Sequence, residues 1–189
     1  MVRIVAGVAG GRRLAVPPSG TRPTSDRVRE ALFSTLQARR DLEGARVLDL
    51  YAGSGALGLE ALSRGAAHVR FVECDRRAAA VVRRNVEALG LGGPGGSAVQ
   101  VTAADVAVLL RSSTDQPYDV VLADPPYALS DGALSTVLNA LSDGGWLAPA
   151  ALIVVERSAR ASPPAWPEGV SELTNRRYGD TAVYYGFAP

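Results

Sequence analysis

Acidic residues and glycines stand where buried strands should end, and their types suggest a ligand-binding edge. The first group lies between Val47 and Gly58, where Asp49 precedes the turn Gly53-Ser54-Gly55, here called the glycine turn, and a helix-forming segment follows. Glycine lets a turn adopt backbone angles that a side chain would forbid, and it lets a ligand approach the backbone closely. A strand, a glycine turn and a helix in this order predict the opening of a Rossmann-type βαβ unit.

Three more acids, Glu73, Asp105 and Asp124, are expected at the same edge of the sheet. In doubly wound sheets the ligand binds beyond the carboxyl ends of the strands, near the point where the strand order reverses. Glu73 follows Gly53 by roughly 20 residues, the spacing at which such folds place an acid for ribose hydroxyls. Because a carboxylate can accept two hydrogen bonds, it matches a 2′,3′-diol. Four acids together favour a ligand site over isolated surface charges.

The glycine turn alone leaves two ligand classes open. Gly53, Gly55 and Gly58 fit the G-x-G-x-x-G spacing of dinucleotide-binding enzymes, so a dehydrogenase is one alternative. Asp49 favours the other class, because its charge would repel a pyrophosphate and attract a sulfonium and an α-amino group. The chain contains no lysine, so it has no Walker A phosphate-binding sequence.

The tetrapeptide Asp124-Pro125-Pro126-Tyr127 follows the fourth expected strand and could hold an amine. Prolines fix the backbone and leave carbonyl groups with no adjacent N–H. Asp124 and the Pro125 carbonyl could accept hydrogen bonds from the exocyclic amine of a flipped base, while Tyr127 stacks on the base. This arrangement would aim the nitrogen lone pair at a sulfonium methyl group, so that catalysis is mainly positioning. A proline-stiffened turn without chemistry is the alternative for the tetrapeptide alone.

Alternating strands and helices would position these groups. We expect strands at about 46–51, 69–73, 99–101, 118–122 and 151–156, with helices at about 56–64, 76–89, 106–111 and 131–142. Two further strands, at about 170–178 and 181–187, meet at Gly179-Asp180, which is a hairpin signal. The pattern predicts a Rossmann-like α/β fold whose seven-stranded sheet is mostly parallel with one antiparallel strand.

A basic extension, residues 1–40, precedes the α/β domain expected over 41–189. It carries eight arginines against Asp26 and Glu30. We expect a β-hairpin over 2–16 and a helix to about Gln37, capped by Thr24 or Ser25. One face of that helix would be apolar and would exclude Arg27 and Arg29; it consists of Val28, Ala31, Leu32 and Leu36. The extension is either a solvated face or an arm that contacts RNA phosphates.

Composition is that of an ordinary globular protein, with 47% apolar and 21% charged residues among 189. We find no apolar run of about 20 residues and no signal-peptide pattern, so a cytoplasmic protein is expected. The single cysteine, Cys74, excludes an internal disulfide, and we expect it to be a small buried residue rather than a catalytic thiol. With His68 the only histidine, no metal site is predicted.

Several motifs resemble those of known methyltransferases. Asp49, Gly53 and Gly55 form a D-x-x-x-G-x-G pattern similar to motif I of class I methyltransferases. The stretch 22–33, R-P-T-S-D-R-V-R-E-A-L-F, together with D-P-P-Y, resembles the small-subunit ribosomal RNA guanine-N2 methyltransferases, the RsmD family. The resemblance extends over nearly the whole chain and includes 11–14 and 146–156. D-P-P-Y occurs in amino-methyltransferases generally, so 22–33 is the discriminating part.

This resemblance implies methyl transfer from S-adenosylmethionine to N2 of one guanine in 16S rRNA, in assembled or assembling small subunits. The implied catalytic residues are Asp124, Pro125, Pro126 and Tyr127. The implied cofactor contacts are Asp49, Tyr51, Gly53, Ser54, Gly55, Glu73, Cys74, Ala104, Asp105 and Asp124, with Ala104 and Asp105 at the adenine. The implied RNA contacts are Arg12, Arg13, Arg22, Thr24 and Arg27. We expect a monomer that acts without a metal or a membrane.

Two alternatives stay open at this point. Another amine, such as adenine N6 or a protein glutamine, could occupy the same pocket, although glutamine methyltransferases usually have asparagine at the position of Asp124. The chain could also be a non-catalytic RNA-binding assembly factor that keeps a relic of the cofactor fold. The intact D-P-P-Y motif and the intact acids argue against this second alternative.

Overall fold

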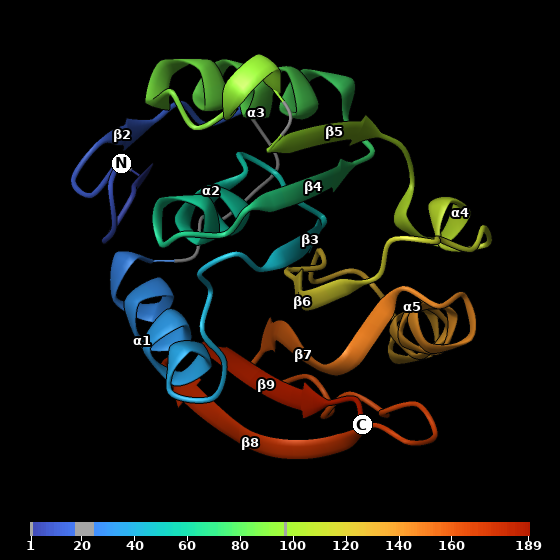
Figure 1. Ribbon diagram of the computed structural model, residues 1–189. Coiled ribbons are helices and arrows are strands. Elements are labelled where there is room, and N and C mark those ends of the chain that lie inside the picture. The colour runs from blue at the N-terminus through green and yellow to red at the C-terminus, as the bar shows by residue number, and fades with distance from the viewer. Residues whose placement is uncertain (1, 18–24, 97) are drawn as a thin grey trace.

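Within residues 2–17, 25–96 and 98–189, which the computed structural model describes, seven strands form one sheet in the order β5-β4-β3-β6-β7-β9-β8 (Figure 1). The strands are β3 (Arg46–Leu50), β4 (His68–Glu73), β5 (Val99–Ala103), β6 (Tyr118–Ala123), β7 (Leu147–Ser158), β8 (Ser171–Tyr178) and β9 (Thr181–Phe187). The pairs from β5 to β7 are parallel, whereas β9 is antiparallel to both β7 and β8. The predicted mostly parallel sheet with one antiparallel strand is confirmed.

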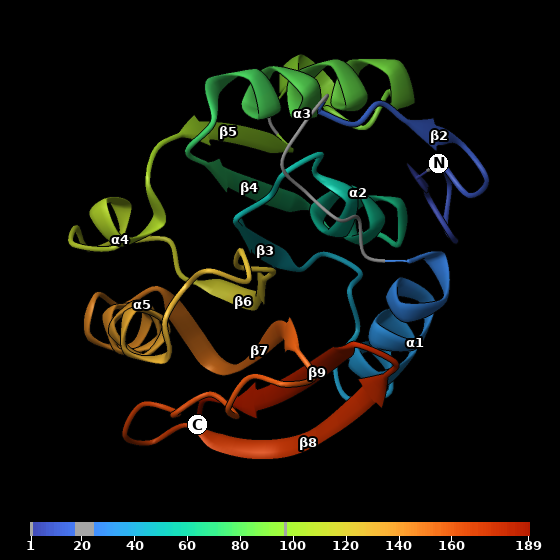
Figure 2. The ribbon, with the colours of Figure 1, turned by 180° about the vertical axis from the view of Figure 1, so that it is seen from behind.

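Helices cover both faces of the sheet (Figures 1 and 2). One buried apolar cluster includes residues of α1 (Asp26–Gln37), α2 (Ala56–Ser63) and α3 (Arg76–Leu89), and the other includes α4 (Val106–Leu109) and α5 (Asp131–Asp143). Along β6, Val120 and Leu122 belong to the first cluster, while Val121 and Ala123 belong to the second. A strand buried on both faces has a continuous apolar sequence, which explains why this strand was predictable.

Some boundaries of the α/β domain differ from the predicted ones by two residues or more. β7 runs over Leu147–Ser158 rather than about 151–156, β5 ends at Ala103 rather than near 101, and α4 ends at Leu109 rather than near 111. None of the helices in the described part of the chain is long and apolar enough to span a bilayer.

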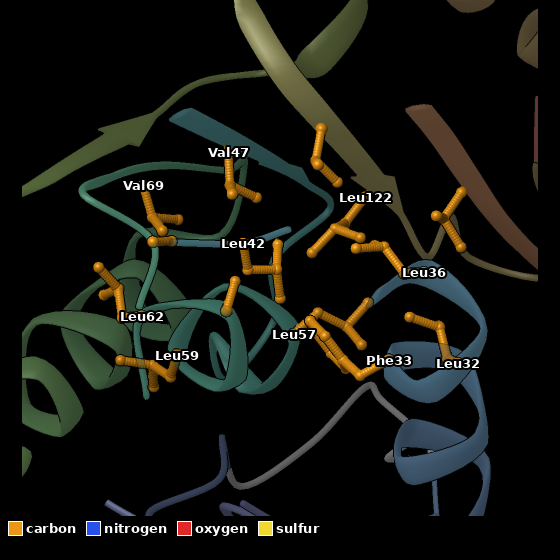
Figure 3. Close-up of a cluster of buried hydrophobic side chains, with 14 of the residues drawn as sticks. Leu32, Phe33, Leu36, Leu42, Val47, Leu57, Leu59, Leu62, Val69 and Leu122 are labelled. Atoms are coloured by element: carbon orange, nitrogen blue, oxygen red, sulfur yellow. The ribbon is translucent and has the colours of Figure 1, made fainter. Parts of the chain in front are cut away.

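The extension begins with a short hairpin and continues into α1. β1 (Val2–Arg3) pairs antiparallel with β2 (Arg13–Leu14), so the predicted hairpin is confirmed in a shorter form. Ser25 caps α1 by accepting a hydrogen bond from Val28 N at 3.3 Å, and the other predicted cap, Thr24, lies outside the described residues. Figure 3 shows α1 contributing Leu32, Phe33 and Leu36 to the buried cluster.

Arg29 corrects the predicted helix face. We expected it off the apolar face of α1, yet it is fully buried. Its guanidinium forms an ion pair with Asp26 at 2.8 Å and donates to the carbonyl of Arg3. A buried cation is tolerated when it is paired and hydrogen-bonded. Arg29 therefore joins α1 to β1, a role that helical periodicity does not reveal.

Buried polar groups of α2 hold the first residues of the extension. Val5 N and Ala6 N donate to the two carboxylate oxygens of Glu60 at 2.7 and 3.0 Å, and Glu60 also pairs with Arg64 at 2.7 Å. Ala9 N donates to the Ser63 hydroxyl at 2.9 Å. These contacts join the extension to the α/β domain, and the division of the chain at residue 40 stays a prediction.

Candidate active site

The carboxyl ends of β4, β3 and β6 lie side by side. β3 lies between the other two strands, with Leu50 paired to Val72 of β4 and to Ala123 of β6. The strand order reverses at β3, because the chain runs to β4 and β5 on one side and to β6 and β7 on the other. Ligands of open α/β sheets bind at such a reversal. The structure thus brings the predicted strand-end acids to the edge where a ligand is expected.

The glycine turn directly follows β3 and has unusual backbone angles. Tyr51, Gly53 and Gly55 have positive φ angles of 60°, 56° and 81°. A Cβ atom at Gly55 would come within 3.2–3.3 Å of three apolar side chains from α2, β4 and α3. Gly55 is therefore required by both its backbone angle and the space around it. Since it is also the N-cap residue of α2, it directs the helix N-terminus toward the site.

Three buried polar side chains hold this region in place. Asp49 accepts a hydrogen bond from Gly58 N at 2.9 Å, and Glu73 accepts one from Gly53 N at 2.8 Å. Asn85, on α3, donates to the carbonyl of Ser54 at 2.9 Å. The two acids were predicted from the sequence, whereas Asn85 was not, because a polar residue inside a helix gives no signal of its own.

Asp49 lies behind the turn rather than on an open surface. Its side chain is buried, with 1% exposure. Burial raises the pKa of Asp49 to about 7, against the lowering effect of the Gly58 N–H, and the charge of Glu73 raises it further. Near neutral pH this carboxyl therefore exchanges a proton readily, and a cation placed nearby would favour its ionised form.

Glu73 ends β4 with both carboxylate oxygens engaged. One oxygen accepts from Gly53 N, and the other accepts from Asp75 N at 2.8 Å. Cys74 follows it and is exposed, so the expectation of a buried cysteine was wrong. The physical reason is its place just beyond the strand, at the rim of the site. Burial raises the pKa of the Cys74 thiol most, and the charge of Glu73 raises it further.

Asp105 and Tyr51 lie on the side of the site that β5 borders. Asp105 is exposed and caps α4 by accepting from Val108 N at 3.0 Å. Ala104 N donates to the Glu73 carbonyl at 3.1 Å, which holds the end of β5 against β4. Burial, followed by the charges of Asp105 and Cys74, raises the pKa of Tyr51 to about 12. Hydrogen bonds from Ala104 N and Gly53 N to Glu73 bring predicted cofactor contacts from three strand ends together.

The D-P-P-Y loop continues from β6 beside the glycine turn. Asp124 N donates to the Leu50 carbonyl at 3.4 Å, so the loop begins against the last residue of β3. Asp124 is half-buried and Pro125 is buried, whereas Pro126 and Tyr127 are exposed. The Tyr127 side chain is 56% exposed. An acceptor, a rigid backbone and a free aromatic face therefore lie in one short loop.

Arg157, at the end of β7, fixes the far side of this loop, and the sequence analysis did not select it. It is buried and forms an ion pair with Asp131 at 2.9 Å. The same nitrogen lies 3.5 Å from the Leu129 carbonyl. Because these contacts flank the residues that follow Tyr127, Arg157 restricts the path of the loop.

The predicted RNA contacts are only partly visible. Arg12, Arg13 and Arg27 are exposed on the extension. Arg12 also donates to the carbonyls of Leu89, at 3.2 Å, and Ala88, so it caps the end of α3. Arg22 and Thr24 lie outside the described residues. All five RNA contacts stay predictions.

The residues present fit S-adenosylmethionine. The carboxylates at the ends of β3, β4 and β5 suit an ammonium group, a ribose diol and an adenine amine. Gly55 lets the turn pack directly against the core, since a Cβ atom there would meet Val82, Leu59 and Phe71. In the described residues no group of three or more His, Cys, Asp and Glu side chains could hold a metal ion.

Two surface hollows lie away from these strand ends. The larger, of about 510 Å³, is lined by residues of α3, the loop after it and β5, among them Arg83 and Val99. The smaller, of about 330 Å³, lies between the end of α1 and the strands β7, β8 and β9. Neither is lined by the four acids or the glycine turn, so the chemistry of the strand ends identifies the candidate site better than concavity does.

The strand order, the glycine turn and the D-P-P-Y loop together define a class I methyltransferase. The family model described as "Conserved hypothetical protein 95" matches residues 2–186, and the chain belongs to this family. It is 42% identical, over 96% of its length and 87% of the relative's, to "Ribosomal RNA small subunit methyltransferase D" of Escherichia coli strain K12.

Another relative and a solved structure agree over nearly full length. "Putative rRNA methyltransferase YlbH" of Bacillus subtilis is 34% identical and covers 96% of each chain. The structure of "Putative methyltransferase yhhF" from Escherichia coli matches with a TM-score of 0.84 and 37% identity, covering 99% of this chain and 97% of the other. The family resemblance stated from the sequence is confirmed, and S-adenosylmethionine is the cofactor that this class of enzyme uses.

Proposed function

We propose that this protein transfers a methyl group from S-adenosylmethionine to the exocyclic N2 amine of a guanine in 16S rRNA of the small ribosomal subunit. The observation that carries the proposal is the D-P-P-Y loop beside the glycine turn, joined through Asp124 N and the Leu50 carbonyl. The full-length relatives named as small-subunit ribosomal RNA methyltransferases support the choice of substrate.

The loop would act on the amine by positioning it. The bound cofactor supplies an electrophilic methyl group on a sulfonium. The Asp124 carboxylate and the Pro125 carbonyl accept the two amine hydrogens, and Tyr127 stacks on the base, so the nitrogen lone pair points along the line of attack. The loop would hold the nitrogen against that methyl group, and Asp124 or water would accept the proton that the nitrogen loses once it is methylated. Arg157 keeps the loop in this shape through Leu129 and Asp131.

The strand-end acids would bind the cofactor. We assign Asp49 to the methionine side, Glu73 to the ribose hydroxyls, and Asp105 with Ala104 to the adenine. Glu73 has a second task, because its carboxylate already orients Gly53 N. The remaining contacts come from residues that adjoin these acids; they are Tyr51, Ser54, Gly53, Gly55, Cys74 and Asp124.

The extension would contact the RNA, through Arg12, Arg13, Arg22, Thr24 and Arg27. Cationic side chains placed against phosphates supply most of the affinity of such an interface. We propose a monomer that works in the cytoplasm on assembled or assembling small subunits, because the substrate is part of that particle.

Incubation with methyl-labelled S-adenosylmethionine and small subunits that lack the modification tests the proposal. We expect label in N2-methylguanosine after digestion of the RNA to nucleosides. Label in N6-methyladenosine would assign the enzyme to the other amine class. Cofactor binding without any transfer would indicate the non-catalytic assembly factor instead, and transfer to protein rather than to RNA would contradict the substrate assignment.

A further inference from the structure

Asn85 is a buried polar residue on α3 that no part of the proposed chemistry uses. Its side chain is 3% exposed and lies on the apolar side of the helix with Val82 and Val86. A buried amide is costly unless its donors and acceptor find partners. Its partners therefore show what this position is for.

Those partners belong to two separate parts of the molecule. The Asn85 amide oxygen accepts from Ala15 N at 2.9 Å, and its nitrogen donates to the Ala15 carbonyl at 3.0 Å. The same nitrogen donates to the Ser54 carbonyl at 2.9 Å. Both amide hydrogens and the oxygen are thus engaged. One side chain joins the extension to the glycine turn.

The two ends of this link lie in the two parts of the molecule that bind different ligands. Ser54 is the middle residue of the glycine turn, so its carbonyl direction fixes the peptide plane between Ser54 and Gly55. Ala15 follows β2, which carries Arg13, and both ribbon views show β2 beside one end of α3 (Figures 1 and 2). Arg12 reinforces this docking through the Leu89 carbonyl.

We propose that Asn85 is a positioning residue that couples the extension to the cofactor-binding turn. This inference rests on the proposed function. RNA held by the extension would fix the position of Ala15, and Asn85 would transmit this constraint to Ser54. The affinity of the glycine turn for the cofactor would therefore rise. By linkage the cofactor strengthens RNA binding by the same factor. Asn85 is distinct from the catalytic residues, because it contacts only backbone groups.

A purely structural role is separable from this one, because Ser63 offers a matched control. Ser63 is as buried as Asn85 and also bonds twice to the extension, accepting from Ala9 N at 2.9 Å and donating to the Ala6 carbonyl at 2.5 Å. Within the described residues, the Ser63 side chain makes no hydrogen bond to the glycine turn. Loosening the extension through Ser63→Ala should therefore lower stability without altering the cofactor turn.

Calorimetry with S-adenosylhomocysteine, with and without unmodified small subunits, tests the coupling. We expect Asn85→Ala to raise the cofactor Kd about 5-fold to 10-fold and to reduce the enhancement by small subunits toward one, the range being typical of a coupled pair of sites. Ser63→Ala should keep both values. If Asn85→Ala folds poorly, Asn85→Gln replaces it in the test. This variant keeps a buried amide but displaces it by one methylene, so it should show the same rise in Kd and the same loss of enhancement.

Two results would overturn the inference. One is an unchanged Kd and an unchanged enhancement in both Asn85 variants, and the other is an equal loss in Ser63→Ala. A wild-type protein that binds no S-adenosylhomocysteine would instead refute the proposed function itself, so the two failures are distinguishable.

Discussion

The Asp49 carboxylate accepts a hydrogen bond from Gly58 N at 2.9 Å, within a fully enclosed setting behind the glycine turn. The acid that the sequence assigns to a cationic ligand therefore also fixes the first turn of α2. Only the ligand-binding role depends on the ionisation of this carboxyl, whose pKa burial raises to about 7, because a protonated carboxyl can still accept the Gly58 hydrogen bond.

Cofactor binding should be proton-linked through Asp49. The cofactor ammonium and sulfonium favour the ionised carboxylate, which predominates above pH about 7, so affinity should rise from pH 6 to pH 8 and then level off. Calorimetry in buffers of different ionisation enthalpy should show proton release. Asp49→Asn should bind more weakly and lose this pH dependence. Retention of the dependence in the variant would assign it to another group.

The same pKa has the opposite consequence for stability. Because the folded-state pKa lies above the ordinary value of 3.8, this group contributes most to stability below pH 4, and its contribution is lost as the pH rises through 7. A shift of this size corresponds to a change on the order of 4 kcal/mol. Urea unfolding of wild type and Asp49→Asn between pH 4 and pH 8 should show that the wild type loses more stability than the variant as the pH rises.

Asp124→Ala should abolish methyl transfer. Loss of the acceptor leaves the amine misoriented, which should reduce kcat by about 100-fold or more while cofactor affinity stays largely intact. Asp143→Ala serves as the control. Asp143 is an exposed acid at the C-terminal end of α5, so this variant should keep full activity. A near-normal rate in Asp124→Ala would refute its role.

Removal of exposed arginines from the extension should weaken RNA binding. Arg12 is a poor target, since it caps α3, so the double variant Arg13→Gln/Arg27→Gln is more informative. Each lost phosphate contact should lower the magnitude of the salt slope by about 1. Arg111→Gln/Arg160→Gln removes the same charge from exposed positions elsewhere. Equal slopes in the two double variants would identify the extension as a solvated face.

Cys74 should report on cofactor occupancy. Its exposure permits alkylation by iodoacetamide, but its raised pKa makes the reaction slow at neutral pH and faster in alkaline buffer. S-adenosylhomocysteine should protect it if the adenosine lies against the ends of β4 and β5. Mass spectrometry of the alkylated fraction measures this, with Cys74→Ser as the blank. Equal labelling with and without the ligand would remove Cys74 from the cofactor contacts.

Gly58→Ala should destabilise the protein strongly. A Cβ atom there would lie 2.4 Å from the ring of Phe71 and 2.8 Å from Val69. Overpacking of this kind typically costs about 1–3 kcal/mol. Gly132→Ala, in α5, meets nothing within 4 Å and should be neutral or slightly stabilising. Urea denaturation of the two variants compares them directly, and equal midpoints would contradict the packing described for Gly58.

The order of strands and helices was predictable because apolar runs and helical periodicity depend on burial against a sheet. β6 is buried on both faces, and α3 has one apolar face, so each carries a strong local pattern. The glycine turn and the D-P-P-Y loop were predictable for another reason, since their residue types are dictated by backbone geometry and by ligand chemistry.

The polar groups inside the protein were not predictable in this way. Three of these groups form hydrogen bonds with residues far away in the sequence: Arg29 with Arg3, Asn85 with Ala15, and Arg157 with Leu129. The exposure of Cys74 was predicted wrongly because Cys74 is the first residue after β4, and the chain passes there from a buried strand to an exposed loop within one residue. Local patterns report burial on average, whereas these positions depend on tertiary contacts.

The docking of the extension also constrains the order in which the molecule can be completed. Residues 5–9 are bound by Glu60 and Ser63, and Ala15 by Asn85, which are separated from them by 54 to 70 positions. During synthesis residues 5–9 therefore find their partners only after α2 has been made, and Ala15 finds Asn85 only after α3 has been made. Because contacts between residues far apart in the chain form slowly, docking of the extension is expected to follow the formation of α2 and α3.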